Sequence, residues 1–318
     1  MNSKELLCLL DSYLATRRAL GLKDGPHRRL LKDFLQYVAK EGTFGPALTQ
    51  RVLDWACSTP NPHAITRQIL RFRVVRGFLS YLKTVCPQVE VPPGGILKGP
   101  RRRPPYVFFQ DEMARLLNLA GTLGPRGSLR PHTYQTIIGL LTGTGLRVNE
   151  ALRLTMADVN LDLVPPRLHI VNTKFHKSRW VPLHPTTAEA LRHYKEQRSQ
   201  GKYVEPTDPF FIGRRGKPVH YHTLKQGFTS LVRRLGTVGT ESQRGPSLHS
   251  LRHSFAVCRL RSWYEQGSDV QALAPMLSVY LGHRHLRDSY WYLSALPDLL
   301  NAASDRFSIY AEKEGRHE

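Results

Sequence analysis

The chain has 318 residues and a formal net charge of +21, from 46 Lys and Arg against 25 Asp and Glu. This length is about enough for two domains, and the excess of positive charge makes nucleic acid the expected partner. Apolar stretches such as Leu6 to Leu10 are too short to span a bilayer, so we expect no membrane partner. The scattered cysteines form neither a zinc-type pair nor a disulfide framework, which suits a reducing cytoplasm: Cys8, Cys57, Cys86 and Cys258.

The first 91 residues are predicted to form a small helical domain. Apolar residues recur at the spacing of a helix over 3–19, 30–38 and 69–82. Asn61-Pro62 marks a turn before the last of these segments. No convincing alternation of apolar and polar residues interrupts this part of the chain, so we expect helices without strands.

Residues 92–108 are predicted to be a basic linker. Proline and glycine crowd the run PPGGILKGPRRRPP over 92–105, which can hold neither a helix nor a central strand. An isolated run of charge is more often a solvated tether. The net charge of the whole chain favours a linker that lies along a phosphate backbone instead. Its cationic side chains are those of Lys98, Arg101, Arg102 and Arg103.

Residues 109–318 are predicted to form a second domain, mainly helical with one small hairpin. Two short apolar segments over 167–171 and 179–183, joined by a polar stretch, are typical of paired strands. The expected helices cover 110–120, 133–141, 148–154, 185–199, 221–235, 251–265 and 272–281, with a helical tail over 299–310. The glycines at positions 143 and 145 are expected to end the second of these helices.

Two cationic residues stand at positions where chemistry is possible. Arg147 follows a glycine turn at the start of a predicted helix, and Glu150 lies three residues further on, within reach of an ion pair. Taken alone, this pair is more typical of a structural salt bridge. Lys174 lies in the turn of the predicted hairpin, where an isolated lysine is usually only a surface residue.

Histidines and aromatic residues follow towards the carboxyl end. In LHSLRHSFA, His249 can share one helix face with either Arg252 or His253. The Glu of a helical zinc motif is missing and an arginine lies between the histidines, so we expect no metal. His283 closes the run Leu-Gly-His, and three consecutive aromatic residues, most often part of a core, follow at 290–292.

Together these side chains suit one reaction, the attack of a tyrosine hydroxyl on a phosphodiester. Two guanidinium groups match the charge that spreads over the nonbridging oxygens in the transition state. A histidine can help the phenol lose its proton, and a lysine can protonate the departing sugar oxygen. Because cationic side chains do the electrostatic work, neither a metal ion nor another cofactor is expected.

The order of these motifs resembles the tyrosine recombinases, also called the phage integrase family. TGTGLRVNEAL, a hairpin lysine, HSLRH, LGH and a tyrosine nine residues later recur with the expected gaps. The resemblance implies a helical core-binding domain followed by the family's catalytic domain. It also implies that Arg147 is the first catalytic arginine, that Glu150 braces it, and that Lys174 is the general acid for the 5′-oxygen.

The resemblance assigns the remaining roles near the carboxyl end. Arg252 would be the second phosphate clamp, paired with His249, and His283 would donate a hydrogen bond to the phosphate. Tyr292 would be the nucleophile; Tyr290 is its rival, and the spacing from the histidine favours Tyr292.

By the same resemblance, the reaction proceeds through a 3′-phosphotyrosyl bond without ATP. Four protomers would assemble on two double-stranded DNA sites, with the carboxyl-terminal tail docked on a neighbour and with possible accessory proteins. The segment DSYWYLSALPDLL is similar to recombinases carried by transposons and plasmids. Two alternatives stay open: a DNA-relaxing enzyme of the type IB topoisomerase kind, and a DNA-binding relative without activity.

Overall fold

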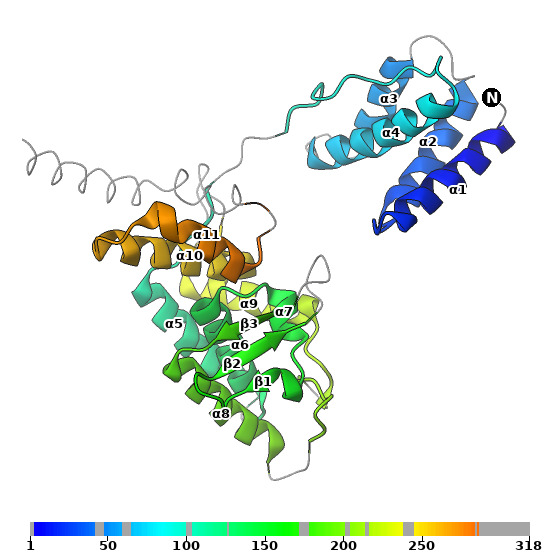
Figure 1. The fold of residues 1–318 in the computed structure, drawn as a ribbon. Coiled ribbons are helices and arrows are strands. Elements are labelled where there is room, and N and C mark those ends of the chain that lie inside the picture. The colour runs from blue at the N-terminus through cyan, green and yellow to red at the C-terminus, as the bar shows by residue number, and fades with distance from the viewer. Residues whose placement is uncertain are drawn as a thin grey trace, which may run out of the picture. The chain divides into compact units, whose positions relative to one another are not determined.

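The computed structural model divides into two compact units, Met1–Arg102 and Arg103–Glu318 (Figure 1). Each unit has its own hydrophobic core. In the part of the chain described here, no helix is long and apolar enough to cross a membrane. The described residues are 3–41, 48–58, 65–99, 104–125, 127–171, 178–200, 204–213, 216–237, 245–283 and 285.

The first unit is a bundle of helices, as its apolar spacing predicts. Its helices are α1 (Ser3–Ala19), α2 (His27–Glu41), α3 (Leu48–Cys57) and α4 (Ile65–Val85). Helix α3 was not anticipated from the sequence. It packs on α4 and α2, and Trp55 on α3 is almost fully buried with its ring edge-on to that of Phe34, 5.2 Å away.

The second unit is mainly helical with a small antiparallel sheet, which confirms the fold class expected from the sequence. Its helices are α5 (Gln110–Gly121), α6 (Arg130–Thr144), α7 (Val148–Leu152), α8 (Pro185–Ser199), α9 (Tyr221–Leu235), α10 (Leu248–Glu265) and α11 (Val270–Leu281). Helices α10 and α11 begin three and two residues before their predicted starts. As a result, His249 lies in the first turn of α10.

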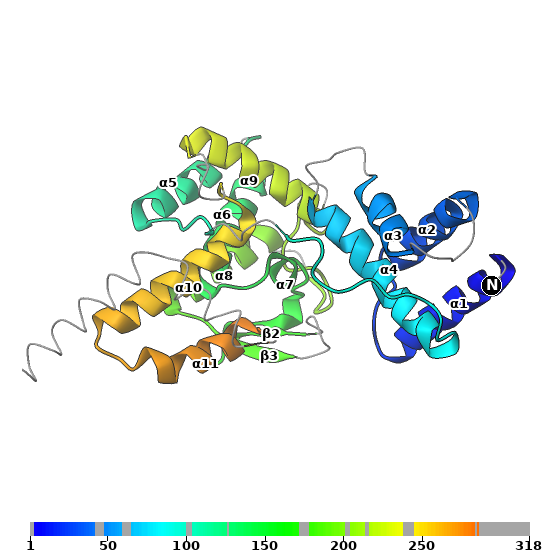
Figure 2. The same cartoon turned by 90° about the horizontal axis from the view of Figure 1, so that it is seen from above.

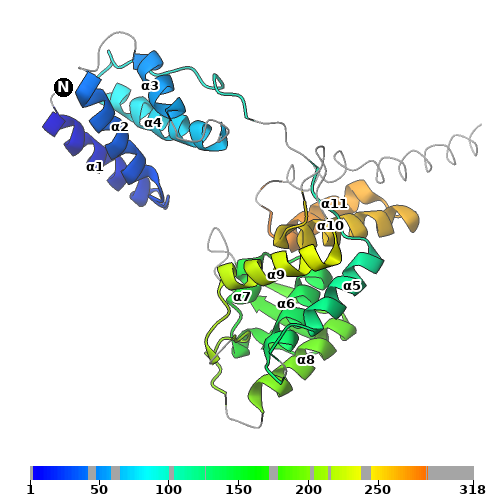
Figure 3. The same cartoon turned by 180° about the vertical axis from the view of Figure 1, so that it is seen from behind.

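Helix α6 is the centre of this unit. Seven of its residues are buried, and it packs against α5, α8 and α10 (Figures 1 and 3). Of the two glycines expected to end this helix, Gly143 does not, and the helix continues to Thr144. A Cβ atom at Gly143 would lie 3.0 Å from the Thr187 hydroxyl of α8, so this glycine allows the two helices to approach closely. The helix ends at Gly145, whose φ of +62° is the left-handed conformation that glycine adopts readily.

The predicted hairpin is present and is extended by a third strand. Strand β2 (Arg167–Ile170) pairs with β3 (Arg179–Pro182), and β1 (Val159–Asn160) adds to the other side of β2, all antiparallel. Leu168 and Val181 face each other across β2 and β3 and are both buried. The residues on the other face, including Trp180, are exposed or half-buried.

Helices α10 and α11 lie against the rest of the unit near the sheet. Figure 2 shows the carboxyl end of α11 beside β2 and β3, and a hydrogen bond from β3 to that end fixes the contact. The chain that enters the second unit is attached to α10 as well. The backbone N–H of Phe108 donates to the hydroxyl of Ser254 at 2.8 Å, and Phe108 is buried.

Candidate active site

Arg147 is placed by the turn that follows α6. Gly145 reverses the chain, Leu146 is buried in the core, and Arg147 caps the start of α7 with extended backbone angles. The carboxylate of Glu150, at the third position of α7, accepts the backbone N–H of Arg147 at 3.1 Å. This is half of a capping box, and it fixes Glu150 directly beside the arginine that precedes the helix.

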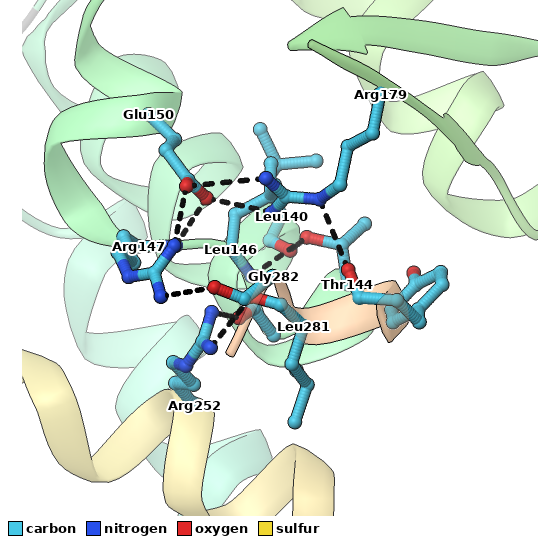
Figure 4. Close-up of polar contacts among 11 residues, drawn as sticks. Leu140, Thr144, Leu146, Arg147, Glu150, Arg179, Arg252, Leu281 and Gly282 are labelled. Carbon is cyan, nitrogen blue, oxygen red and sulfur yellow. Dashed lines mark hydrogen bonds and ion pairs between the residues drawn. The ribbon is translucent and has the colours of Figure 1, made fainter. Parts of the chain in front are cut away.

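Glu150 is shared by two arginines (Figure 4). Its Oε1 accepts from Arg147 Nη1 at 2.9 Å and from Arg179 Nη1 at 3.2 Å, while its Oε2 accepts from Arg179 Nη2 at 2.8 Å. Burial by itself would raise the pKa of Glu150, but the hydrogen bonds and charges of Arg179 and Arg147 outweigh it. The pKa therefore lies below its ordinary value, and the carboxylate stays ionised at neutral pH.

Arg252 reaches the same place from α10. The residue is only 2% exposed, and its Nη1 donates to the carbonyl of Gly145 at 2.8 Å. Its Nη2 donates to the carbonyl of Leu281 at 2.7 Å. Arg252 therefore ties the turn before Arg147 to the end of α11.

Three consecutive carbonyls at the end of α11 each accept a hydrogen bond from a different arginine. Arg179 Nε donates to Tyr280, Arg252 Nη2 to Leu281, and Arg147 Nη2 to Gly282, at 3.0, 2.7 and 2.6 Å. The last carbonyls of a helix have no partner within the helix and carry the negative end of its dipole. They offset part of the repulsion among three guanidinium groups.

The cluster is nevertheless strongly positive. Three arginines and one carboxylate give a formal charge of 3 − 1 = +2. The side chain of Arg147 is 29% exposed, so its guanidinium can reach an anion outside the core. Guanidinium groups retain their charge at any working pH and match phosphate oxygens with paired N–H groups. This arrangement is suited to holding a phosphodiester.

The two histidines named from the sequence lie on the same elements. His249 is one turn before Arg252 on α10, and its ring lies edge-on to that of His253 with centroids 4.4 Å apart. His283 directly follows Gly282, and its backbone N–H donates to the carbonyl of Ser278 at 2.9 Å.

Several predicted site residues fall outside the described part of the chain. These are Lys174, Tyr290, Tyr292 and the linker residues Arg101, Arg102 and Arg103. Lys98 is described, and it is exposed in the first unit. Within the ranges given above, no three His, Cys, Asp or Glu side chains are grouped to hold a metal ion. The structure thus brings together Arg147, Glu150 and Arg252 at the end of α11.

Arg179 belongs to this cluster and was not identified from the sequence. A signal was available in the alternation of β3, since side chains two apart point to the same face of a strand. Arg179 is in phase with Val181 and Leu183, which are buried, and out of phase with Trp180, which is 49% exposed. A cation on the buried face of a sheet needs a partner, and here that partner is Glu150.

Comparisons with known proteins agree with this architecture. Residues 107–297 match the model of the phage integrase family. A protein of Sinorhizobium fredii, described as "Putative integrase/recombinase y4rB", is 36% identical over 303 residues, covering 93% of this chain and 95% of that protein. The tyrosine recombinase XerC of Bacillus subtilis is 28% identical over 204 residues, covering 63% of this chain and 60% of that protein.

A solved structure shows the same fold. The structure of the XerH site-specific recombinase bound to its palindromic difH substrate has a TM-score of 0.68 and an identity of 18%. The match covers 96% of this chain and 85% of that chain. At this level of identity the likeness shows the fold only.

Proposed function

The chain belongs to the phage integrase family, the tyrosine recombinases, and on that premise we propose that it recombines DNA through a covalent 3′-phosphotyrosyl intermediate. The observation that carries the proposal is the cluster of Arg147, Arg179 and Arg252 around Glu150 and the end of α11. Its formal charge of 3 − 1 = +2 suits a group that gains negative charge during the reaction. A phosphodiester does so when a nucleophile attacks it.

Each step of the reaction has a residue to perform it. The phenol oxygen of Tyr292 attacks phosphorus as His249 takes the phenolic proton, and the bond to the 5′-oxygen breaks. Lys174 protonates that oxygen, so a free 5′-hydroxyl leaves and the 3′-phosphate stays on the enzyme. Arg147 and Arg252 hold the nonbridging oxygens, with a hydrogen bond from His283. Attack by the 5′-hydroxyl of a partner strand reverses the steps, and the bond energy is conserved without ATP.

The first unit supplies a surface for the duplex. A groove of about 680 Å³ between α2 and α4 is lined by five cationic side chains and one carboxylate, those of Arg28, Arg29, Lys32, Arg67, Arg71 and Asp33. Such a surface attracts a phosphate backbone irrespective of its sequence. We assign DNA binding to this unit and the chemistry to the second one.

The proposed partner is double-stranded DNA in an assembly of four protomers on two sites. Both units would bind each DNA site, and the basic linker 92–108 would lie along the DNA backbone. The carboxyl-terminal tail would dock on a neighbouring protomer. The chain would act as a recombinase of a transposon or plasmid.

Trapping the covalent intermediate tests the proposal. Duplexes selected from a randomised library by the wild-type protein are nicked close to the cleavage point, so that the released fragment diffuses away. We expect an adduct that survives denaturation in the wild type and in Tyr290→Phe, and none in Tyr292→Phe, whose DNA affinity should be unchanged. Peptide mapping of the adduct identifies the modified residue.

Two results would contradict the proposal. A persisting adduct in Tyr292→Phe would move the nucleophile elsewhere. Relaxation of a supercoiled plasmid that lacks the selected site would indicate a topoisomerase instead of a recombinase.

A further inference from the structure

The reaction needs two arginines on the phosphate, but the site contains three. Arg179 is the additional one. It lies on the buried face of β3. All three nitrogens of its guanidinium donate to groups of the protein, two to the Glu150 carboxylate and one to the Tyr280 carbonyl. Its contacts therefore suggest a role in arranging the other groups.

Arg179 fixes the orientation of the Glu150 carboxylate. It donates to both oxygens from two different nitrogens, at 3.2 Å to Oε1 and 2.8 Å to Oε2. Arg147 uses only one side-chain bond to the same carboxylate, from Nη1 to Oε1. The fork defines the plane of the carboxylate together with the backbone N–H of Arg147, which donates to Oε2 at 3.1 Å. The position of Arg147 Nη1 thus depends in part on the fork that Arg179 makes.

Arg179 also supports the other contact of Arg147. The Nη2 group of Arg147 donates to the carbonyl of Gly282, two residues after the Tyr280 carbonyl that Arg179 Nε holds. Gly282 itself has a φ of +67°, and an added Cβ would lie 3.1 Å from Arg179 Nη1 and 3.3 Å from Arg147 Nη1. Arg179 therefore touches both groups that hold the Arg147 guanidinium, the carboxylate and the last turn of α11.

Charge gives a second reason for a third arginine. The side chain of Glu150 is only 8% exposed. With Arg147 as its sole partner, this carboxylate would neutralise the charge of the Arg147 guanidinium, which is proposed to hold the phosphate. With Arg179 present, the carboxylate is shared and the cluster keeps a formal charge of 3 − 1 = +2. Loss of Arg179 would reduce this charge to +1 and draw Glu150 towards Arg147.

We propose that Arg179 is a positioning residue, which holds Glu150 and the end of α11 so that Arg147 presents its remaining N–H groups to the scissile phosphate. The inference rests on the proposed function. It assigns no contact with DNA to Arg179 and predicts that Arg179 acts through Glu150.

A double-mutant cycle tests this role. Adduct formation on the nicked selected duplex is followed in single turnovers at saturating protein for Arg179→Met, Glu150→Gln and the double variant. We expect a rate loss of about 10- to 100-fold in each single variant, because a displacement of about 1 Å at a reacting group has that cost. The double variant should be no slower than the slower single variant, and the Kd for DNA should change by less than about twofold.

Two further variants separate positioning from charge and from folding. Arg179→Lys keeps the charge but cannot make the fork, so it should restore little of the rate. Arg192→Met is the matched control, since Arg192 also pairs with a glutamate in this unit, but at an exposed site, and its rate should equal that of the wild type. Additive losses in the double variant, or full activity in Arg179→Lys, would overturn the proposal.

A measurement without DNA keeps the inference separate from the proposed function. The Glu150 carboxylate is titrated by carbon NMR in protein labelled at glutamate. The charged groups that face it are Arg147 at the start of α7 and Arg179 on β3, and Arg252 from α10 and His283 lie at the adjoining end of α11. In Arg179→Met the pKa of Glu150 should rise, because burial is then opposed by Arg147 alone. An unchanged pKa of Glu150 would overturn the inference. Failure of the wild type to form an adduct would refute only the proposed function.

Discussion

Gly145 is a position where a single added methyl group should strongly disturb the second unit. The residue ends α6 with a φ of +62°, and its carbonyl accepts the hydrogen bond of the buried Arg252. An added Cβ would lie 2.5 Å from Cδ1 of Phe255 and 2.9 Å from a methyl carbon of Leu281. Real Cβ atoms do not approach other atoms so closely, so Gly145→Ala must move either the Phe255 ring or the turn itself.

The expected cost has two parts. The left-handed conformation costs about 1–2 kcal/mol for a residue with a Cβ atom. Crowding in a packed core costs about 1–3 kcal/mol more. Gly236→Ala separates the two, because Gly236 also ends a helix with a positive φ of +75° and has no atom within 4 Å of an added Cβ. We expect Gly145→Ala to lose about 2–5 kcal/mol of unfolding free energy and Gly236→Ala about 1–2 kcal/mol.

Amide hydrogen exchange provides the assay. The most protected amides of α6 report the unfolding free energy of the second unit, whatever the first unit does. The difference between the two variants, about 1–3 kcal/mol, corresponds to protection factors lower by roughly 5- to 150-fold in Gly145→Ala. Equal protection in the two variants would refute the reasoning, because the contact with Phe255 would then cost nothing.

Two further predictions concern Glu150 and the groove of the first unit. Because the pKa of Glu150 is lowered in the fold, its contribution to stability is present above pH of about 4.5 and is lost as pH falls through the folded value. Glu150→Gln should therefore cost about 3–5 kcal/mol at pH 7 and less at pH 3 in urea unfolding, whereas the exposed Glu189→Gln should cost under about 1 kcal/mol. A constant difference across this pH range would contradict the assignment. Arg67→Ala, in the groove, should weaken binding to selected and unselected duplexes alike and lower the salt-dependence slope by about 0.9 in a titration by fluorescence anisotropy. Arg73→Ala, exposed on the same helix but outside the groove, is the control, and an equal fall in its slope would remove the groove from the interface.

Local patterns were sufficient for most of the fold. Apolar periodicity gave α1, α8 and α9 to the residue, because each is long and carries one clear buried stripe. Helix α3 was not predicted because it has only 10 residues, and a helix of that length depends on packing against its neighbours more than on its own sequence. Strand β1 has two residues, too few to show any alternation.

Part of the candidate site could likewise be predicted from the sequence, and part required the structure. The sequence brought Arg147 and Glu150 together because they are three residues apart, and the structure pairs them at 2.9 Å. The contacts of Arg252 span 107 and 29 residues and end on backbone carbonyls. Every residue has such a carbonyl, so no side chain in the sequence marks the acceptor. For this reason the capture of three consecutive carbonyls by three arginines required the structure.

The last turn of α11 therefore provides hydrogen-bond acceptors to all three arginines. A shift of the Leu281 and Gly282 carbonyls by about the 2.6–2.7 Å length of one such bond would break one hydrogen bond of Arg252 and one of Arg147 at once. The bond from Arg179 lies one residue earlier, on the Tyr280 carbonyl. Each arginine keeps a second partner, the Gly145 carbonyl or the Glu150 carboxylate, so such a shift would loosen all three together. A displacement at the end of α11 would therefore be felt by Arg147, Arg179 and Arg252 together, although they come from three different parts of the sequence.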